Sequence, residues 1–182
     1  MIEEITEEIL IDENKLQSRV EELGADITAE YNKSDDIVMI CVLRGAFIFM
    51  ADLAREVNLP VVLDFIDVTS YEGGTETTGD VRIIKDLEES IEGKDVLIVE
   101  DIIDTGLTLK HVIKMLETRD PASIKVCTLL DKPERRTEKQ VEVDWNGFEI
   151  PNEFVVGYGL DYDQKYRNVP YIFIPKPKLY QD

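Results

Sequence analysis

The sequence predicts an α/β protein in which a mainly parallel, twisted sheet is flanked by helices, all within a single domain of residues 1–182. Apolar runs rich in β-branched residues occupy 37–43, 61–68, 96–99 and 124–130, as expected of strands that are buried on both faces. Segments with helical periodicity separate these runs. A length of 182 residues is also close to the usual size of one domain.

The helical segments are located by their apolar stripes. Apolar residues recur every three or four positions between 16 and 27 and between 109 and 116, and residues 45–57 form a mostly apolar helix. Beyond Pro133 the pattern weakens to three short strand-like runs whose order the sequence does not fix: 148–150, 154–156 and 171–174. We therefore expect a core over about residues 35–175 and a small lobe formed by the N-terminal helix and the C-terminal segments.

The charge balance limits the partners of this protein. Acidic residues number 39 against 20 basic ones, a formal net charge of −19, so phosphate backbones and anionic lipids would be repelled. We expect no nucleic-acid partner and no membrane association. The longest apolar stretches are far shorter than the roughly 18 residues of a membrane span. The acidic N-terminus is unlike a signal peptide, which indicates a cytoplasmic protein.

The clearest chemical signal is the junction between the strand at 96–99 and the helix at 109–116. Two acids, Glu100 and Asp101, follow the strand, at the edge where parallel sheets bind their ligands. The next turn opens a helix, whose free N–H groups attract a phosphate. Paired carboxylates beside a phosphate are what a polyphosphate-bound Mg²⁺ requires. The turn consists of Asp104, Thr105, Gly106, Leu107 and Thr108.

Each of these residues, taken singly, has a plainer explanation. An acid at a strand end is often only solvated, and Asp104 or Thr105 could cap the helix. The ordered set of an acidic pair, a third acid and a Thr-Gly turn favours a ligand site instead. Nucleotide-cofactor classes fit less well. The chain has no GxxxxGK(S/T) loop, and residues 157–162 lack the last glycine of a dinucleotide fingerprint.

Residues 99–108 resemble the phosphoribosyl pyrophosphate signature of type I phosphoribosyltransferases. Further segments resemble the hypoxanthine-guanine branch of that family, in order and spacing, over residues 37–174: Leu43-Arg44-Gly45, Ser70-Tyr71, Asp131-Lys132-Pro133, residues 154–161 and Arg167. One departure is Arg44-Gly45-Ala46 where the family commonly has Lys-Gly-Gly, which alters a side chain but keeps the backbone role. The resemblance implies the type I phosphoribosyltransferase fold, with a small hood lobe.

The resemblance also implies a purine salvage transferase that depends on Mg²⁺. It would convert hypoxanthine or guanine and phosphoribosyl pyrophosphate to IMP or GMP and pyrophosphate, as a homodimer or homotetramer. Asp104 would be the catalytic residue and would handle the proton at the purine N7. Glu100 and Asp101 would hold the ribose hydroxyls and a first Mg²⁺, and Asp161 would hold a second Mg²⁺ beside the pyrophosphate.

The substrate-binding residues follow from the same resemblance. Lys132 carries only donors and suits a purine with a carbonyl at C6, which excludes adenine. Phe154 would stack on the base while the Val155 main chain reads the ring edge. Without the resemblance, Lys132 would be a solvated lysine and Phe154 an ordinary core residue. An uncommon cis peptide after Leu43 would turn the next two amides toward pyrophosphate. The set is completed by Arg44, Gly45, Ser70 and Tyr71 at the start of a Gly-rich closing loop, Ile102, Ile103, the turn at 104–108, and Arg167 near the pyrophosphate.

Three other functions remain open on the sequence alone. An RNA-binding regulator of pyrimidine genes with this fold should show a basic face, which the acidic excess opposes. A phosphoacceptor signalling domain would be shorter and would leave the segment after Lys132 without a purpose. A xanthine-preferring or adenine-preferring transferase is the nearest alternative. The choice among hypoxanthine, guanine and xanthine depends on main-chain acceptors around Val155 and Asp161, which the sequence does not fix.

Overall fold

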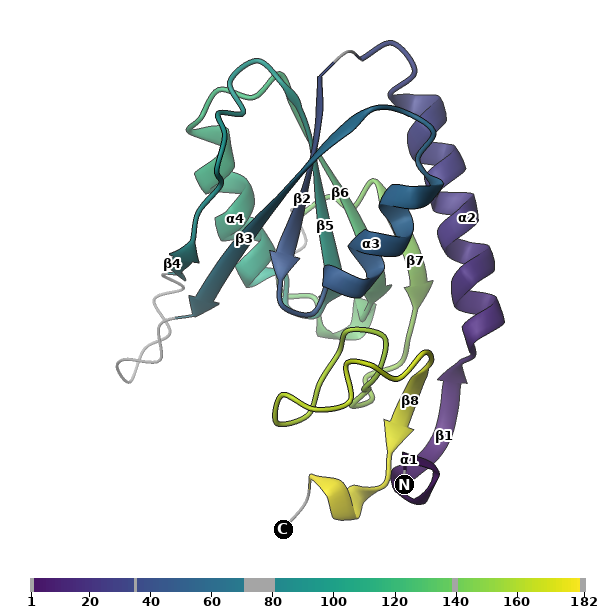
Figure 1. Ribbon diagram of the computed structural model, residues 1–182. Coiled ribbons are helices and arrows are strands. Elements are labelled where there is room, and N and C mark those ends of the chain that lie inside the picture. Colours follow the sequence, from purple (N-terminus) through teal and green to yellow (C-terminus); the bar gives the residue numbers. More distant parts are fainter. Residues whose placement is uncertain (1, 35, 71–80, 139–140, 181–182) are drawn as a thin grey trace.

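Six strands form the central sheet, in the order β4-β3-β2-β5-β6-β7 (Figure 1). The computed structural model describes residues 2–34, 36–70, 81–138 and 141–180. Neighbouring strands run parallel except for β3 and β4, which are antiparallel, so the predicted mainly parallel sheet is confirmed. The strands of this sheet are β2 (Ile37–Leu43), β3 (Val61–Ser70), β4 (Val81–Lys85), β5 (Asp95–Ile103), β6 (Ser123–Asp131) and β7 (Trp145–Glu149).

Helices cover both faces of the sheet (Figure 1). On one face α2 (Glu13–Glu30) and α3 (Phe47–Glu56) share a core with alternate residues of β2 and β5, such as Met39 and Leu97. On the other face α4 (Leu107–Glu117) packs against the intervening residues. The described residues contain no helix that is long and apolar enough to cross a membrane.

A small lobe lies beyond the carboxyl edge of the sheet (Figure 1). It contains α1 (Ile2–Ile5) and an antiparallel pair formed by β1 (Thr6–Ile11) and β8 (Ile172–Pro175). The lobe therefore joins the two ends of the chain, as expected, but it does not contain the amphipathic N-terminal helix. That helix is α2, and its apolar stripe packs with the core because all four stripe residues are buried there.

Two of the predicted strands differ from the structure. Residues 154–156 do not form a strand, because the chain turns at Gly157 (φ 104°) and only Val156 pairs, with Phe173. The strand predicted at 96–99 extends to Ile103, so the acidic pair lies within β5 rather than after it. Tyr71 and the Gly-rich loop at 73–79 fall outside the described residues.

Candidate functional site

The acidic pair occupies the carboxyl edge of β5. The pairing of β5 with β2 ends at Val99, which lies opposite Cys41, whereas its pairing with β6 continues to Ile103. Glu100 and Asp101 are therefore flanked by a strand on one side only. Glu100 is 8% exposed, and its Oε1 accepts a hydrogen bond from the Asp101 N–H at 3.2 Å.

Burial perturbs both carboxyl groups of the pair. Desolvation raises the pKa of Glu100 well above its usual range, and the neighbouring Asp101 carboxylate raises it further. Burial also raises the pKa of Asp101, although its hydrogen bonds and the Arg167 guanidinium act in the opposite direction. Glu100 is buried and Asp101 is partly buried, so a cation bound beside them would stabilise their charged forms.

The turn after β5 forms a small anion-sized hollow. Gly106 adopts φ 83°, a left-handed conformation that favours glycine, and it is the N-cap of α4. The hollow has a volume of about 90 Å³. The N–H groups of the first turn of α4 and the positive end of its dipole suit a phosphate here, although the Leu107 N–H already donates to the Thr105 hydroxyl at 3.3 Å. The described residues around the hollow are Glu100, Ile102, Ile103, Asp104, Thr105, Gly106, Thr108 and Leu109, and Leu107 begins the helix with an exposed side chain.

Two loops converge on the acidic pair. The peptide bond between Leu43 and Arg44 is cis, as predicted. A Cβ placed on Gly45 would lie 1.5 Å from Asp101 Oδ2, so the Asp101 carboxylate packs directly against this backbone. A Cβ on Gly159 would lie 2.1 Å from the Gly45 carbonyl oxygen, which brings the loop after Val156 to the same place. The glycines allow these close backbone approaches.

Polar side chains join these loops at their outer rim. Arg167 Nη2 lies 2.8 Å from Asp161 Oδ1, and Arg167 Nη1 donates to the Gly159 carbonyl at 2.7 Å. Gln164 Oε1 accepts from Arg167 Nη2 at 3.0 Å and from Arg44 Nη1 at 3.2 Å. Gln164 was not predicted from the sequence, because no pattern marks a glutamine in a loop as the acceptor shared by two arginines.

Lys132 and Asp104 are neighbours at the ends of β6 and β5. Lys132 is 8% exposed, and its N–H donates to the Ile103 carbonyl at 3.0 Å. Burial lowers the pKa of Lys132, while the nearby Asp104 carboxylate acts in the opposite direction. Arg135 Nε donates to Asp104 Oδ1 at 2.7 Å. Sequence reasoning missed Arg135, because no local pattern indicates its contact with Asp104, which is 31 residues away in the sequence.

Phe154 lies in an aromatic group at the border of the small lobe. Its ring centroid is 6.0 Å from that of Tyr162 and 5.0 Å from that of Tyr180. Phe154 is 37% exposed, so part of its ring is open to a ligand. Val156 exchanges hydrogen bonds with Phe173 at 3.0 and 2.9 Å, so the main-chain groups of Val155 face the opposite way.

The donor set fits magnesium only together with a ligand. Within the described part of the chain, no group of three or more histidine, cysteine, aspartate or glutamate side chains is arranged to hold a metal ion alone. Glu100 and Asp101 offer hard oxygen ligands, and Mg²⁺ commonly takes its other ligands from a polyphosphate and water. Both oxygens of Asp161 are engaged, by Arg167 and by the Gln164 N–H.

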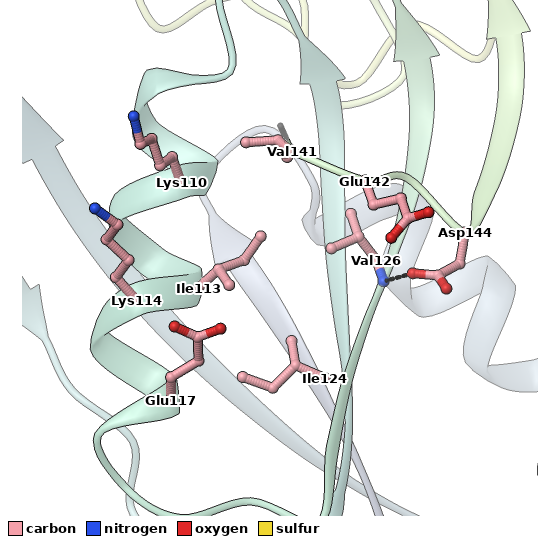
Figure 2. Close-up of a pocket in the computed structure, with 9 residues that line it drawn as sticks. All are labelled: Lys110, Ile113, Lys114, Glu117, Ile124, Val126, Val141, Glu142 and Asp144. Atoms are coloured by element: carbon pink, nitrogen blue, oxygen red, sulfur yellow. Dashed lines mark hydrogen bonds between the residues drawn. The ribbon is translucent and has the colours of Figure 1, made fainter. Parts of the chain in front are cut away.

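A larger hollow, of about 330 Å³, lies between α4 and β6 (Figure 2). Its walls include the aliphatic side chains of Ile113, Ile124 and Val126, with Lys110 and Lys114 at one rim. None of the predicted site residues is among the described residues around it. We therefore assign the site to the smaller hollow beside β5, where the buried acids and the open helix end meet.

Most of the predicted site residues are brought together at one edge of the sheet. Ser70 ends β3, but its side chain and Tyr71 are outside the described part of the structure. The remaining residues form three neighbouring groups, around the acidic pair, around the turn at 104–108, and around Lys132. Phe154 stands at the border of the lobe.

Comparisons with known proteins agree with this geometry. The family model for a phosphoribosyl transferase domain matches residues 7–163. The hypoxanthine phosphoribosyltransferase of Haemophilus influenzae is 56% identical, with 91% of this chain and 93% of that protein covered. The hypoxanthine-guanine phosphoribosyltransferase of Bacillus subtilis is 48% identical over 100% of this chain and 99% of its own. A crystal structure of a hypoxanthine phosphoribosyltransferase from Staphylococcus aureus has a TM-score of 0.95, with 47% identity and coverage of 100% of this chain and 97% of that one.

Proposed function

The chain belongs to the phosphoribosyltransferase family, and we propose that it transfers ribose 5-phosphate from phosphoribosyl pyrophosphate to hypoxanthine or guanine. The observation that carries the proposal is the junction of buried acids, open helix end and buried lysine at one sheet edge. The near full-length likeness to purine transferases places the chain in purine salvage and leaves the regulatory, signalling and xanthine alternatives unsupported.

Base choice rests on Lys132. A lysine offers three donors and no acceptor, so it pairs with a carbonyl at C6 and not with the amino group of adenine. Its burial at 8% exposure strengthens this discrimination, because a buried ammonium without a partner is costly. Phe154 would stack on the base, and the Val155 main chain would read the ring edge.

Transfer forms the bond between C1 of the ribose and N9 of the purine, and breaks the bond from C1 to pyrophosphate. The purine loses a proton as its N9 becomes bonded. Asp104 is the proposed acceptor of that proton at N7, since it is close to Lys132, is half-exposed and borders the hollow beside β5. The transition state is cation-like at C1, so positioning and charge stabilisation do most of the catalysis.

The pyrophosphate side of the site would be held by backbone amides and arginines. The 5-phosphate would occupy the turn at 104–108, and the amides of Arg44 and Gly45 would face the pyrophosphate beside Arg167. Bound Mg²⁺ would supply positive charge against the pyrophosphate oxygens. Glu100 and Asp101 would hold it, partly through water, and Asp161 would hold a second ion after exchanging its contact with Arg167. Ser70 and Tyr71 remain proposed members of a closing loop.

We also propose a single domain over residues 1–182, located in the cytoplasm, that assembles as a homodimer or homotetramer. Both cysteines are free and buried, as expected in a reducing compartment. Exposed apolar side chains on α3 and β3 support assembly, since contiguous exposed apolar surface marks interaction sites. They include Phe47 (43% exposed) and Leu63 (44% exposed). Sedimentation equilibrium on the purified protein measures the assembly directly.

An activity assay tests the proposal. Purified protein with Mg²⁺ and phosphoribosyl pyrophosphate is expected to convert hypoxanthine and guanine to IMP and GMP, with little product from adenine. Chelation of the metal should abolish turnover, and its return should restore it. Activity on uracil alone, or on no purine, would refute the assignment. Parallel assays with xanthine measure the base preference.

A further inference from the structure

Residues 135–138, which we call the brace, lie directly behind the phosphate turn. The Thr137 and Glu138 N–H groups donate to the Thr105 carbonyl oxygen at 3.2 and 3.0 Å. The Thr137 hydroxyl donates to the same oxygen at 3.3 Å. One carbonyl of the turn is therefore held by three donors of a segment that follows β6 in the chain.

These bonds fix the direction of an amide that a phosphate would use. The Thr105–Gly106 peptide is trans, since the only cis bond in the described residues follows Leu43. The carbonyl and N–H of a trans peptide point in opposite directions. Because the brace holds the Thr105 carbonyl on its own side, the Gly106 N–H points away from the brace.

A charged pair ties the brace to α4. Lys110 Nζ lies 2.6 Å from Glu138 Oε2, and the two side chains are 30% and 21% exposed. The Lys110 N–H also donates to the Gly106 carbonyl at 2.9 Å, so the same residue closes the first turn of the helix. A Cβ on Gly106 would lie 3.2 Å from Glu138 Cβ, which leaves little space between brace and turn.

The other end of the brace is anchored beside the base site. The Arg135 N–H donates to the Lys132 carbonyl at 3.0 Å within the 3₁₀ turn η1 (Pro133–Arg135). Arg136 Nη2 lies 2.8 Å from Oδ2 of the buried Asp131. The brace thus has a firm anchor at the end of β6.

From these contacts we propose that Lys110 and Glu138 are positioning residues for phosphoribosyl transfer. The pair holds the brace against the Thr105 carbonyl and so keeps the turn in the shape that receives the 5-phosphate. The inference rests on the proposed function. Figure 2 shows the amino groups of Lys110 and Lys114 turned away from the apolar walls of the larger hollow, so neither lysine is engaged there.

Kinetics of Lys110→Met and Glu138→Gln test this role. Each variant is expected to raise KM for phosphoribosyl pyrophosphate and Kd for IMP about threefold to fivefold, with kcat and KM for hypoxanthine unchanged. Lys114→Met is the matched control. Lys114 lies one helical turn after Lys110, at the same rim, and has no ion pair among the described residues. Lys114→Met should change neither KM for phosphoribosyl pyrophosphate nor Kd for IMP.

A variant with the two charges exchanged tests whether the ion pair, rather than either residue alone, is responsible for the effect. Lys110→Glu combined with Glu138→Lys is expected to recover most of the lost affinity for phosphoribosyl pyrophosphate and IMP. A lower melting temperature with unchanged KM in both single variants would reduce the pair to a structural role and overturn the inference. So would an equal effect of Lys114→Met, or no recovery in the exchanged variant. An inactive parent protein would instead refute the proposed function.

Discussion

The turn at 104–108 and the aromatic group around Phe154 are proposed to bind two parts of one nucleotide, the phosphate and the base, but they are built in different ways. The turn joins β5 directly to α4 and is backed by a brace with several hydrogen bonds. Phe154 is 37% exposed and contacts Tyr180, near the far end of the chain. The difference teaches that the turn is held in place by several hydrogen bonds and an ion pair from the brace, whereas the base-stacking side depends on ring contacts of a half-exposed side chain.

The largest expected effect is at Asp104, the first residue of the turn. Asp104→Asn keeps the size of the side chain but removes the proton acceptor. We expect kcat to fall by about 100-fold to 10,000-fold, the usual contribution of a general base. KM for phosphoribosyl pyrophosphate should change little, because the amide oxygen of the asparagine can still accept the hydrogen bond from Arg135 and so keep the turn against the brace. Steady-state kinetics with hypoxanthine measure both constants, and an unchanged kcat would exclude Asp104 as the base.

Lys132 should give the next largest effect. Lys132→Met keeps the apolar stem and removes the charged donors. KM for hypoxanthine is expected to rise about tenfold to 100-fold, the loss typical of a hydrogen bond to a charged group. Discrimination against adenine should fall in parallel. Because burial lowers the pKa of Lys132, the ammonium is disfavoured in the fold, so the melting temperature should not fall. If Lys132→Met melts at a lower temperature than the parent, the rise in KM would be explained by a destabilised fold and not by loss of a contact with the base.

The two regions also differ in how far the sequence predicts them. Strands such as β2 and β6 were predicted nearly to the residue, because continuous apolar runs can only be buried on both faces. The acidic pair and the turn were equally accessible, since their geometry follows from one strand and one helix. The family resemblance added Lys132, which the residues alone would have left as a solvated lysine.

The remaining features depend on contacts that no local pattern records. The pairing of β1 with β8 joins the chain ends, and β1 does not show the alternation that would identify it, since its burial rises only at Ile11. Arg135 lies in η1 and Gln164 in a loop, and their contacts with Asp104 and Arg44 are set by how segments distant in sequence meet. Sequence periodicity describes which face of an element is buried and says nothing about such loop contacts.

A third prediction concerns the loss of folding stability that the buried acidic pair causes when it is ionised. In the unfolded chain Glu100 releases its proton above about pH 4.5. In the folded chain its pKa is raised, so it keeps the proton to a higher pH. Stability without metal should therefore fall as the pH rises toward the raised pKa, and the loss should be complete above it. Glu100→Gln removes the part of this dependence that Glu100 contributes, and Asp101 keeps its own.

At neutral pH the metal-free Glu100→Gln variant is expected to melt about 2–4 °C higher than the parent, as a gain of about 1 kcal/mol would give in a chain of this size. Its affinity for phosphoribosyl pyrophosphate with Mg²⁺ should fall. The exposed Glu89→Gln is the matched control and should change neither quantity. Equal melting temperatures of parent and Glu100→Gln across the pH range would show that the buried acid carries no such cost.

The smallest expected effect lies in the aromatic group, at Tyr180. The ring of Tyr180 lies 5.0 Å from that of Phe154 and tilts against it by 50°. Tyr180→Ala removes this support, and we expect KM for hypoxanthine to rise about twofold to fivefold, as the loss of one aromatic pair implies. KM for phosphoribosyl pyrophosphate should not change, because the turn at 104–108 is supported by the brace.

Tyr180→Phe distinguishes support from competition. The phenylalanine keeps the ring, so KM for hypoxanthine should stay near that of the parent if the ring acts by packing against Phe154. If Tyr180 instead occupies the space of the base, Tyr180→Ala would lower this KM, because the purine would no longer have to displace a side chain. A lower KM would therefore reverse the comparison of the two regions: the aromatic group would be an obstacle to base binding, and the sheet edge would supply the affinity.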